Sequence, residues 1–262
     1  MYRNLAYIPN QREMRLFTWD EEGNRIETDC PYRPYFYSET NNPRHDGISL
    51  YGTKLRKHYA TSELDRRKKI EDLNDHKIYE NISPYQQFLV DRFWQENETD
   101  EFQQFPLKIW FFDIETYSPD EFPKPEEASH MINVITVYDT AHKHYYTWGI
   151  NPYTPKEDNI TYFHCKSEGE LSQRFLDFYC EDRPDILSGW NSEIFDIPYV
   201  INRVRNLLGE EATRLFSPVH DEIMKPIYQR VYRGNFGQQT SKYVVEGVSM
   251  LDYLDVYKTF SM

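Results

Sequence analysis

The feature that most constrains the fold is a change of pattern near residue 105. Beyond that point, apolar runs of strand length alternate with segments whose apolar residues keep helical spacing. This alternation predicts an α/β domain with a mixed sheet. The expected strands are residues 107–115, 131–139, 143–150 and 185–191, the expected helices are 170–182 and 197–210, and a long β-hairpin from 225 leads into a helix that ends near 260.

The first 104 residues follow a different pattern, which is typical of short strands. Apolar and polar residues tend to alternate from Leu5 to Tyr37, with turn residues between them. Two helices follow, and Ser62 and Ser83 are their expected N-caps. The polar, acidic segment 95–104 is the best candidate for a boundary. We therefore expect two domains, a mostly β domain at 1–104 and the α/β domain at 105–262.

Composition narrows the class of function. The 262 residues include 43 acids and 30 bases, a net charge of −13, which argues against binding duplex nucleic acid with the whole surface but leaves a localised groove open. Three cysteines without CxxC spacing support neither a disulfide framework nor a zinc finger. The sequence has no long apolar run and no secretory signal, so we expect a cytoplasmic protein. Aromatic residues make up 16%, which fits either an aromatic core or base-stacking surfaces.

Two acids, Asp113 and Glu115, follow the apolar run "IWFF". Side chains at i and i+2 of a strand point to the same face, so these carboxylates should project side by side. The apolar run predicts a strand buried on both faces, and such strands open at their carboxyl ends into a crevice where ligands bind. Two neighbouring carboxylates repel unless they share a proton or a cation, which indicates a site for a hard divalent ion such as Mg²⁺. The alternative is a strand that simply ends at the surface.

A second group of polar residues lies in "GWNSEIFDIPY", residues 189–199. Asp196 stands where a helix is expected to begin, so it can cap that helix, bind a metal ion, or do both. Asn191 can orient a phosphate group or occupy a turn.

The segment "FFDIET" at 111–116, followed at this distance by "GWNSEIFDIPY", resembles the Exo I and Exo II motifs of the 3′-5′ exonuclease domain of family B DNA polymerases. The similarity extends to "SPYQQFLVDRFW" before that domain. Three later segments, "FDIPYVINRVRNLLGE", "LFSP" and "VEGVSMLDYLDVYKTF", are most similar to polymerases of T-even-type bacteriophages. The resemblance covers most of residues 54–260, and residues 1–53 more loosely.

The resemblance implies an RNase H-like fold with a mixed sheet and a β-hairpin insertion. It also implies a proofreading site in which two Mg²⁺ or Mn²⁺ ions lie about 3.5–4 Å apart. By the same resemblance, Asp113 would bridge both ions, Glu115 would help bind the first ion and orient a water molecule, and Asp196 would support the second ion.

The resemblance also implies contacts with a single-stranded 3′ end and with primer–template DNA. Phe122 would stack on a base, or alternatively pack within its loop. Phe195 would pack beneath the site. The loop at 233–241 corresponds to a hairpin that helps to separate the primer strand, and an ordinary solvated turn is the alternative.

In the family, the fourth carboxylate belongs to the Exo III motif, Y-x-x-x-D. This sequence departs from the family because it contains no Y-x-x-x-D segment. Asp252 and Asp255 lie in "LDYLDVY", which resembles a segment of the family that has no catalytic role. We expect structural roles for both. We therefore expect the N-terminal portion of a DNA polymerase, incomplete at its C-terminus. Either it is cut at an expression or gene-prediction boundary, or it is one half of a split polymerase.

The split-polymerase reading implies a second chain that supplies palm, fingers and thumb, and, if the gene is a phage gene, a place in the cytoplasm of an infected bacterium. One alternative is a catalytically weak structural or DNA-binding subunit that docks this polymerase chain. A more distant alternative is a nucleic-acid-binding regulator that uses the basic cluster Arg66, Arg67, Lys68 and Lys69.

Overall fold

A computed structural model describes residues 2–73, 77–80, 82–94, 106–119, 121–233 and 239–260. The chain divides into two compact units, Met1–Gln104 and Phe105–Met262. The expected boundary segment 95–104 lies outside the described residues.

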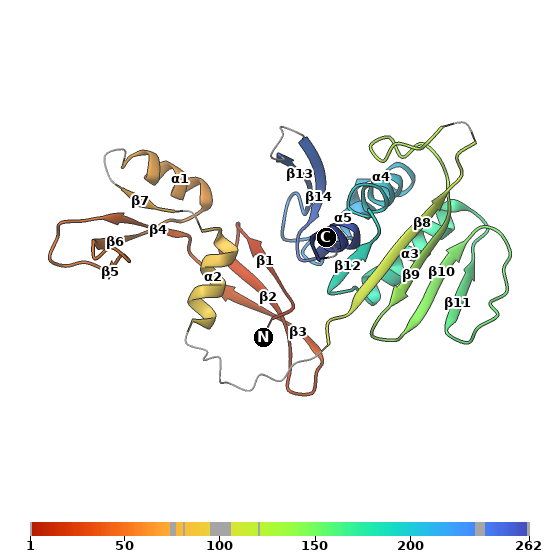
Figure 1. Ribbon diagram of the computed structural model, residues 1–262, viewed down its shortest axis with the longest axis horizontal. Helices are drawn as coiled ribbons and strands as arrows, with labels where there is room; N and C mark the ends of the chain where they lie inside the picture. The colour runs from red at the N-terminus through yellow and green to blue at the C-terminus, as the bar shows by residue number, and fades with distance from the viewer. Residues whose placement is uncertain are drawn as a thin grey trace. The chain divides into compact units, whose positions relative to one another are not determined.

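The first unit is built mainly from antiparallel strands, as the sequence predicts (Figure 1). One sheet has the order β1 (Asn4–Ile8), β2 (Glu13–Trp19) and β3 (Arg25–Pro31). The other has the order β5 (Gly47–Ile48), β6 (Lys54–Tyr59), β4 (Tyr35–Glu39) and β7 (Ile78–Tyr79). A small core forms where α2 (Pro84–Phe93) contributes Phe88 beside the β1–β2 residues Leu5, Met14 and Leu16.

Both helices of this unit begin at the expected caps. Ser62 accepts a hydrogen bond from the amide of Asp65 at the start of α1 (Glu63–Glu71), and Ser83 forms a capping box with Gln86 at the start of α2.

The basic cluster on α1 is partly neutralised within the unit. Arg66 pairs with Glu63 at 2.9 Å, and Lys69 pairs with Asp65 at 3.0 Å. Because two of the four cations already have acidic partners, the cluster offers less net charge to a nucleic acid than the sequence suggests.

The second unit contains a mixed sheet, which confirms the predicted α/β class and is consistent with an RNase H-like fold. The strand order is β11 (Ile160–His164), β10 (His144–Gly149), β9 (Ile132–Asp139), β8 (Ile109–Thr116), β12 (Ile186–Gly189) and β15 (Ser249–Asp252). β9 runs antiparallel to β8 and β10, whereas β12 runs parallel to β8 and β15. The predicted hairpin is formed by β13 (Ile227–Arg233) and β14 (Gln239–Val245), and residues 234–238 lie outside the described residues.

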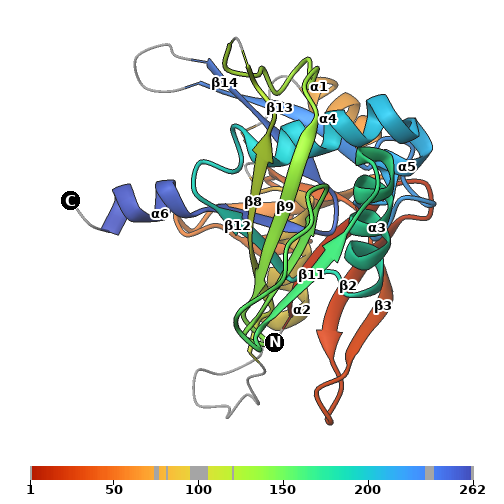
Figure 2. The same cartoon turned by 90° about the vertical axis from the view of Figure 1, so that its right-hand side faces the viewer.

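Helices α3 (Glu168–Glu181), α4 (Asp196–Leu208) and the short α5 (Glu210–Arg214) lie on one side of this sheet, and α6 (Tyr253–Phe260) lies on the other (Figure 2). The core lies between the sheet and the helices α3 and α4. It includes Trp110, Phe112 and Ile114 of β8, Phe175 and Tyr179 of α3, and Ile197, Val200 and Ile201 of α4.

The prediction that β8 is buried on both faces is wrong. Trp110, Phe112 and Ile114 are at most 6% exposed, but Phe111 is 37% exposed, and Asp113 and Glu115 are also exposed. The reason is that α3 and α4 both cover the same face of the sheet. The strand therefore alternates between a buried and an open face, and the two acids stand on the open one.

None of the helices in the described ranges combines the length and apolarity that a membrane crossing requires.

Candidate active site

The strand β8 presents Asp113 and Glu115 on one face, as their i, i+2 spacing predicts. The residues between and around them, Phe112 and Ile114, point into the core. Partial burial raises the pKa of the Asp113 carboxyl above its usual value. The rigid core beneath β8 thus fixes where these two acids stand.

Asp196 reaches the same stretch of β8 from the start of α4. Its Oδ1 accepts a hydrogen bond from the backbone amide of Ile114 at 3.2 Å, and its side chain is buried. The structure therefore brings Asp196 beside the Asp113–Ile114 peptide, although the two segments are 82 residues apart in the chain.

The end of β12 explains this contact. β12 pairs with β8 only as far as Ser188, which lies opposite Phe111. A Cβ on the next residue, Gly189, would lie 2.5 Å from the carbonyl oxygen of Phe112, so only glycine allows this close approach. Beyond Gly189 the chain leaves the sheet, so β12 provides no backbone acceptor beside Ile114. The Asp196 carboxylate accepts the hydrogen bond of the Ile114 amide instead.

Of the two roles that the sequence leaves open for Asp196, the structure does not show the helix cap. Asp196 is the first residue of α4, the N-cap position is Phe195, and no side chain caps this helix. The carboxylate is directed instead to the amide of Ile114 on β8. Local sequence suggested a cap because an acid at a helix start usually bonds to its own first turn.

The electrostatics of Asp196 are unusual for a carboxyl group. Burial first, and then the negative charges of Asp113 and Asp252, raise its pKa to about 7, although the hydrogen bond from Ile114 acts in the opposite direction. Near neutral pH this group therefore exchanges readily between its protonated and charged forms. A cation beside it would favour the charged form.

Two aromatic rings pack together at the start of α4. The ring centroids of Phe122 and Phe195 are 5.0 Å apart, and Phe195 in turn packs on Tyr199 at 5.5 Å. Phe122 is 78% exposed, so one side of the pair is open to solvent.

Asn191 occupies the turn between β12 and α4. Its φ of 61° lies in the left-handed region, which asparagine tolerates better than most residues. This geometry agrees with a turn role, and its side chain is exposed.

The two later acids are engaged in structural contacts. Asp252 is buried and accepts hydrogen bonds from the backbone amides of Asn191 and Glu193. Asp255 pairs with Lys242 of the hairpin.

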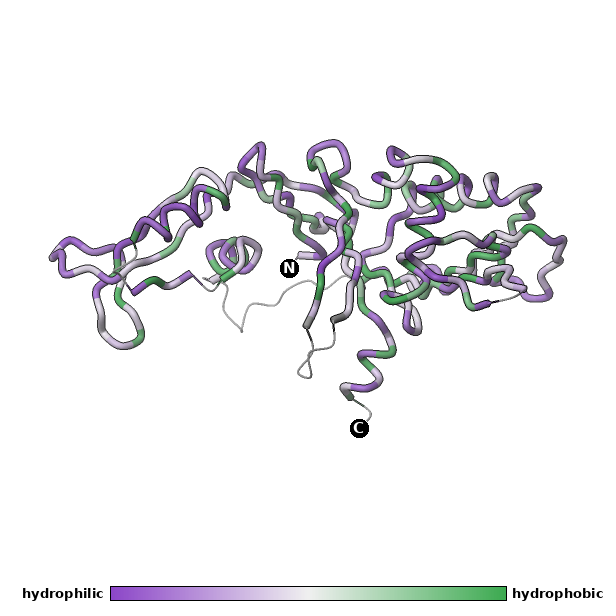
Figure 3. The backbone as a smooth tube through the Cα atoms, turned by 90° about the horizontal axis from the view of Figure 1, so that it is seen from above, coloured by the Kyte–Doolittle hydropathy of each residue, from purple (hydrophilic) through white to green (hydrophobic). Residues whose placement is uncertain are grey.

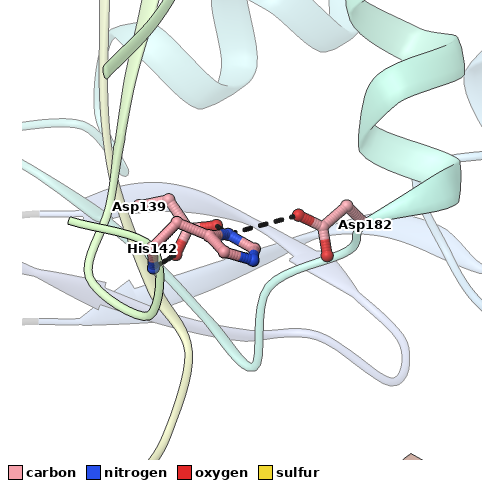
Figure 4. A group of neighbouring side chains, drawn as sticks. All are labelled: Asp139, His142 and Asp182. Carbon is pink, nitrogen blue, oxygen red and sulfur yellow. Dashed lines mark hydrogen bonds and ion pairs between the residues drawn. The ribbon is translucent and has the colours of Figure 1, made fainter. Parts of the chain in front are cut away.

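A different acidic group, which sequence reasoning missed, consists of Asp139, His142 and Asp182 (Figure 4). Within the described ranges it is the only set of three or more such residues whose ligand atoms all lie within 4.8 Å of one another, so Asp113, Glu115 and Asp196 are not gathered this closely. However, the Lys108 ammonium contacts both Asp139, at 3.2 Å, and Asp182. Because a lysine already balances the two carboxylates, the group fits an ion-pair network better than a metal site.

Comparison with known proteins identifies the family. The sequence model of the exonuclease domain of DNA polymerase family B matches residues 69–262. The DNA-directed DNA polymerase of Escherichia phage RB69 is 35% identical over 182 residues, which are 59% of this chain and 19% of that protein. The corresponding polymerase of Enterobacteria phage T4 is 30% identical over 174 residues, 57% of this chain and 19% of that protein.

A more distant relative is a DNA polymerase of Thermococcus litoralis, which is 27% identical over 226 residues, 74% of this chain and 12% of that protein. The matched part of this chain thus spans about a fifth, or less, of each of these relatives. Exonuclease domains of this family use divalent metal ions. The chain belongs to DNA polymerase family B and carries the exonuclease domain of that family.

Proposed function

We propose that the second unit hydrolyses the terminal phosphodiester bond at the 3′ end of single-stranded DNA, and that it serves as the proofreading part of a family B polymerase. The observation that carries the proposal is the hydrogen bond between Asp196 and the Ile114 amide, because it joins the two motif segments at one point on the sheet. The proposed place of action is inside the cell, where DNA is replicated.

The donor set fits two divalent ions, Mg²⁺ or Mn²⁺. All three groups are carboxylates, which such ions prefer, and Asp113 and Glu115 share one face of β8. Such ions would supply an activated water molecule and balance the charge on the leaving oxygen. In this proposal Asp113 would help to hold both ions, Glu115 would help to hold the first and orient the water molecule, and Asp196 would help to hold the second.

The chain's own residues perform the remaining tasks. Asp196 must lose its proton to act as a ligand, and its pKa of about 7 makes this possible near neutral pH. The open side of the Phe122–Phe195 pair can stack on the terminal base. Asn191 is proposed to contact the DNA, and the β13–β14 hairpin to help hold the primer strand away from its template.

The experiment uses an oligonucleotide with a 5′ label, incubated with the chain and Mg²⁺ or Mn²⁺. We expect weak, stepwise shortening from the 3′ end that EDTA abolishes. It should be weak because the sequence has no Y-x-x-x-D segment to supply a fourth carboxylate. The double variant D113N/E115Q should lose at least about 100-fold in rate, whereas the exposed helical acid variant D177N should not. Shortening that survives the double substitution would refute the proposal.

A second candidate function is docking of a polymerase chain, with only weak catalysis. It is favoured by α6, which has no buried residue and contains both hydrophilic and hydrophobic residues along its length (Figure 3). Tyr253, Tyr257 and Phe260 on this helix are all exposed. An exposed apolar patch of this kind is typical of a protein interface.

Its test is a mixture with a chain that carries the palm, fingers and thumb of a phage relative. Stable co-elution that the variant Y253A/Y257A/F260A loses would support docking. Separate elution of the wild-type chains would count against it.

A further inference from the structure

The carboxylate of Asp252, at the end of β15, is the acceptor of three backbone amides. Its Oδ1 accepts from Asn191 and from Leu254, both at 2.9 Å, and its Oδ2 accepts from Glu193 at 3.2 Å. Only 3% of the residue is exposed. Hydrogen bonds to an ionised acceptor are stronger than those between neutral groups, so this side chain fixes the backbone that it contacts.

The sheet topology places Asp252 where it can act on the candidate site. β15 runs parallel to β12, and Asp252 lies opposite Gly189, the last residue of β12. Residues 190–195 then form the loop that leads from β12 to Asp196. Two of the three amides bound by Asp252 belong to this loop.

The rest of the loop depends on Asn191. Its carbonyl oxygen accepts the amides of Ile194 at 3.2 Å and of Phe195 at 3.1 Å. A shift of Asn191 would therefore be passed to Phe195 and to the adjacent Asp196. On the other side of the loop, the Glu193 side chain forms an ion pair with Lys242 of β14.

We propose that Asp252 is a positioning residue for Asp196: it holds the β12–α4 loop so that the Asp196 carboxylate stays beside β8. This inference rests on the proposed exonuclease function. Asp252 is not expected to touch DNA, since it acts only through the loop. A displacement of about 1 Å in a catalytic group can cost about 100-fold in rate, so loosening this loop should be visible in kcat.

Asp185 offers a matched control at the opposite end of β12. It is also 3% exposed, and its Oδ2 accepts the backbone amide of Lys108 at 2.7 Å. Removing either carboxylate removes a buried acceptor from the same sheet. Only Asp252 contacts the loop that carries Asp196.

The experiment compares D252A, D252N and D185A by three measurements: melting temperature, hydrogen exchange of the amides at 190–196, and exonuclease kcat and KM. For D252A we expect at least about 10-fold faster exchange in this loop and a kcat about 10- to 100-fold lower. KM should change less than kcat, because Asn191 and Phe195 belong to this loop but Phe122 does not. D252N should lie between wild type and D252A, because an asparagine oxygen can still accept amides but its NH₂ group cannot. D185A should lower the melting temperature while loop exchange and kcat stay near wild type.

The inference is overturned if D252A leaves loop exchange unchanged, or if D252A and D185A lower kcat equally. If D252A fails to fold, D252N carries the same comparison. A wild-type chain that degrades no DNA would defeat the proposed exonuclease function, whereas the exchange measurement would still show whether Asp252 holds the loop.

Discussion

At the scale of single residues, Asp196 shows how one side chain links fold and chemistry. It accepts the Ile114 amide, which ties the start of α4 to β8, and the same burial raises its pKa to about 7. A carboxyl group that is costly to ionise is a poor choice for stability alone, and perturbed groups of this kind cluster at functional sites. The residue is therefore better explained by a ligand role than by the helix cap that local sequence suggests.

The raised pKa of Asp196 predicts how stability depends on pH. Between about pH 4 and pH 7 the folded chain keeps a proton on this group that the unfolded chain releases, so its contribution to stability is complete below about pH 4 and is lost as pH rises through 7. D196N cannot ionise. Relative to wild type in EDTA, D196N should therefore gain about 3 kcal/mol in free energy of unfolding between pH 5 and pH 8.

Urea unfolding of both proteins at the two pH values measures this gain. An equal difference at pH 5 and pH 8 would show that Asp196 ionises normally in the folded chain.

The exposed ring of Phe122 predicts an effect on DNA binding. Stacking of a base on an aromatic ring contributes about 1–3 kcal/mol, so F122A should raise KM for single-stranded DNA about 10-fold or more and leave kcat nearly unchanged. The melting temperature should change little, because the ring is mostly exposed. Tyr153, an exposed aromatic residue of the same unit, gives the control Y153A. Equal KM values for F122A and Y153A would exclude a specific stacking role.

At the scale of elements, the short strand β12 determines where the candidate site forms. Because β12 ends at Gly189, the chain can turn at Asn191 and start α4 beside β8. The last residue of the parallel strand β15, Asp252, lies opposite Gly189, the last residue of β12. The Asp252 side chain accepts the backbone amide of Asn191 in the turn. The candidate site thus forms where the parallel strands β12 and β15 end and the neighbouring strand β8 continues.

Gly189 makes this arrangement testable. In G189A the new Cβ would lie 2.5 Å from the Phe112 carbonyl oxygen and 2.8 Å from the Ser192 Cβ, so the ends of β8 and β12 must separate. We expect a loss of about 1–3 kcal/mol in free energy of unfolding. The control is G169A in the first turn of α3, where the nearest neighbour is 3.9 Å away and alanine should be neutral or stabilising. Chemical denaturation measures both, and equal stability of the two variants would contradict the close approach.

Several elements could be predicted from the sequence because their local patterns are strong. The period of two in β8 placed Asp113 and Glu115 on one face, and the helical spacing of Ile197, Ile201 and Val204 gave α4. Ser83 and Gln86 marked the start of α2 by their spacing.

Other features could not be predicted, because they depend on distant residues. β11 is a short edge strand and α5 is a helix of five residues, so neither has a pattern long enough to detect. The run "IWFF" reads as buried on both faces, and only the placement of α3 and α4 shows that Phe111 is open. The contact of Asp252 with Asn191 spans 61 residues, which leaves no local signal.

At the scale of the whole molecule, the candidate site is assembled entirely within the second unit. Asp113, Glu115 and Asp196 come from β8 and α4, and Phe122 lies on the loop that follows β8. The family match covers residues 69–262, which include all of these positions. The proposed chemistry therefore requires no side chain from the first unit.

The most direct measurement is a titration of the chain with Mn²⁺, followed by electron paramagnetic resonance. The central claim is that Asp113, Glu115 and Asp196 converge on divalent cations. The wild-type chain should bind Mn²⁺, more tightly at pH 8 than at pH 6 because Asp196 must lose its proton. D113N and D196N should each weaken this binding about 10-fold or more, and D139N at the Lys108 cluster should not. Binding that is lost in D139N and kept in D113N and D196N would contradict the claim.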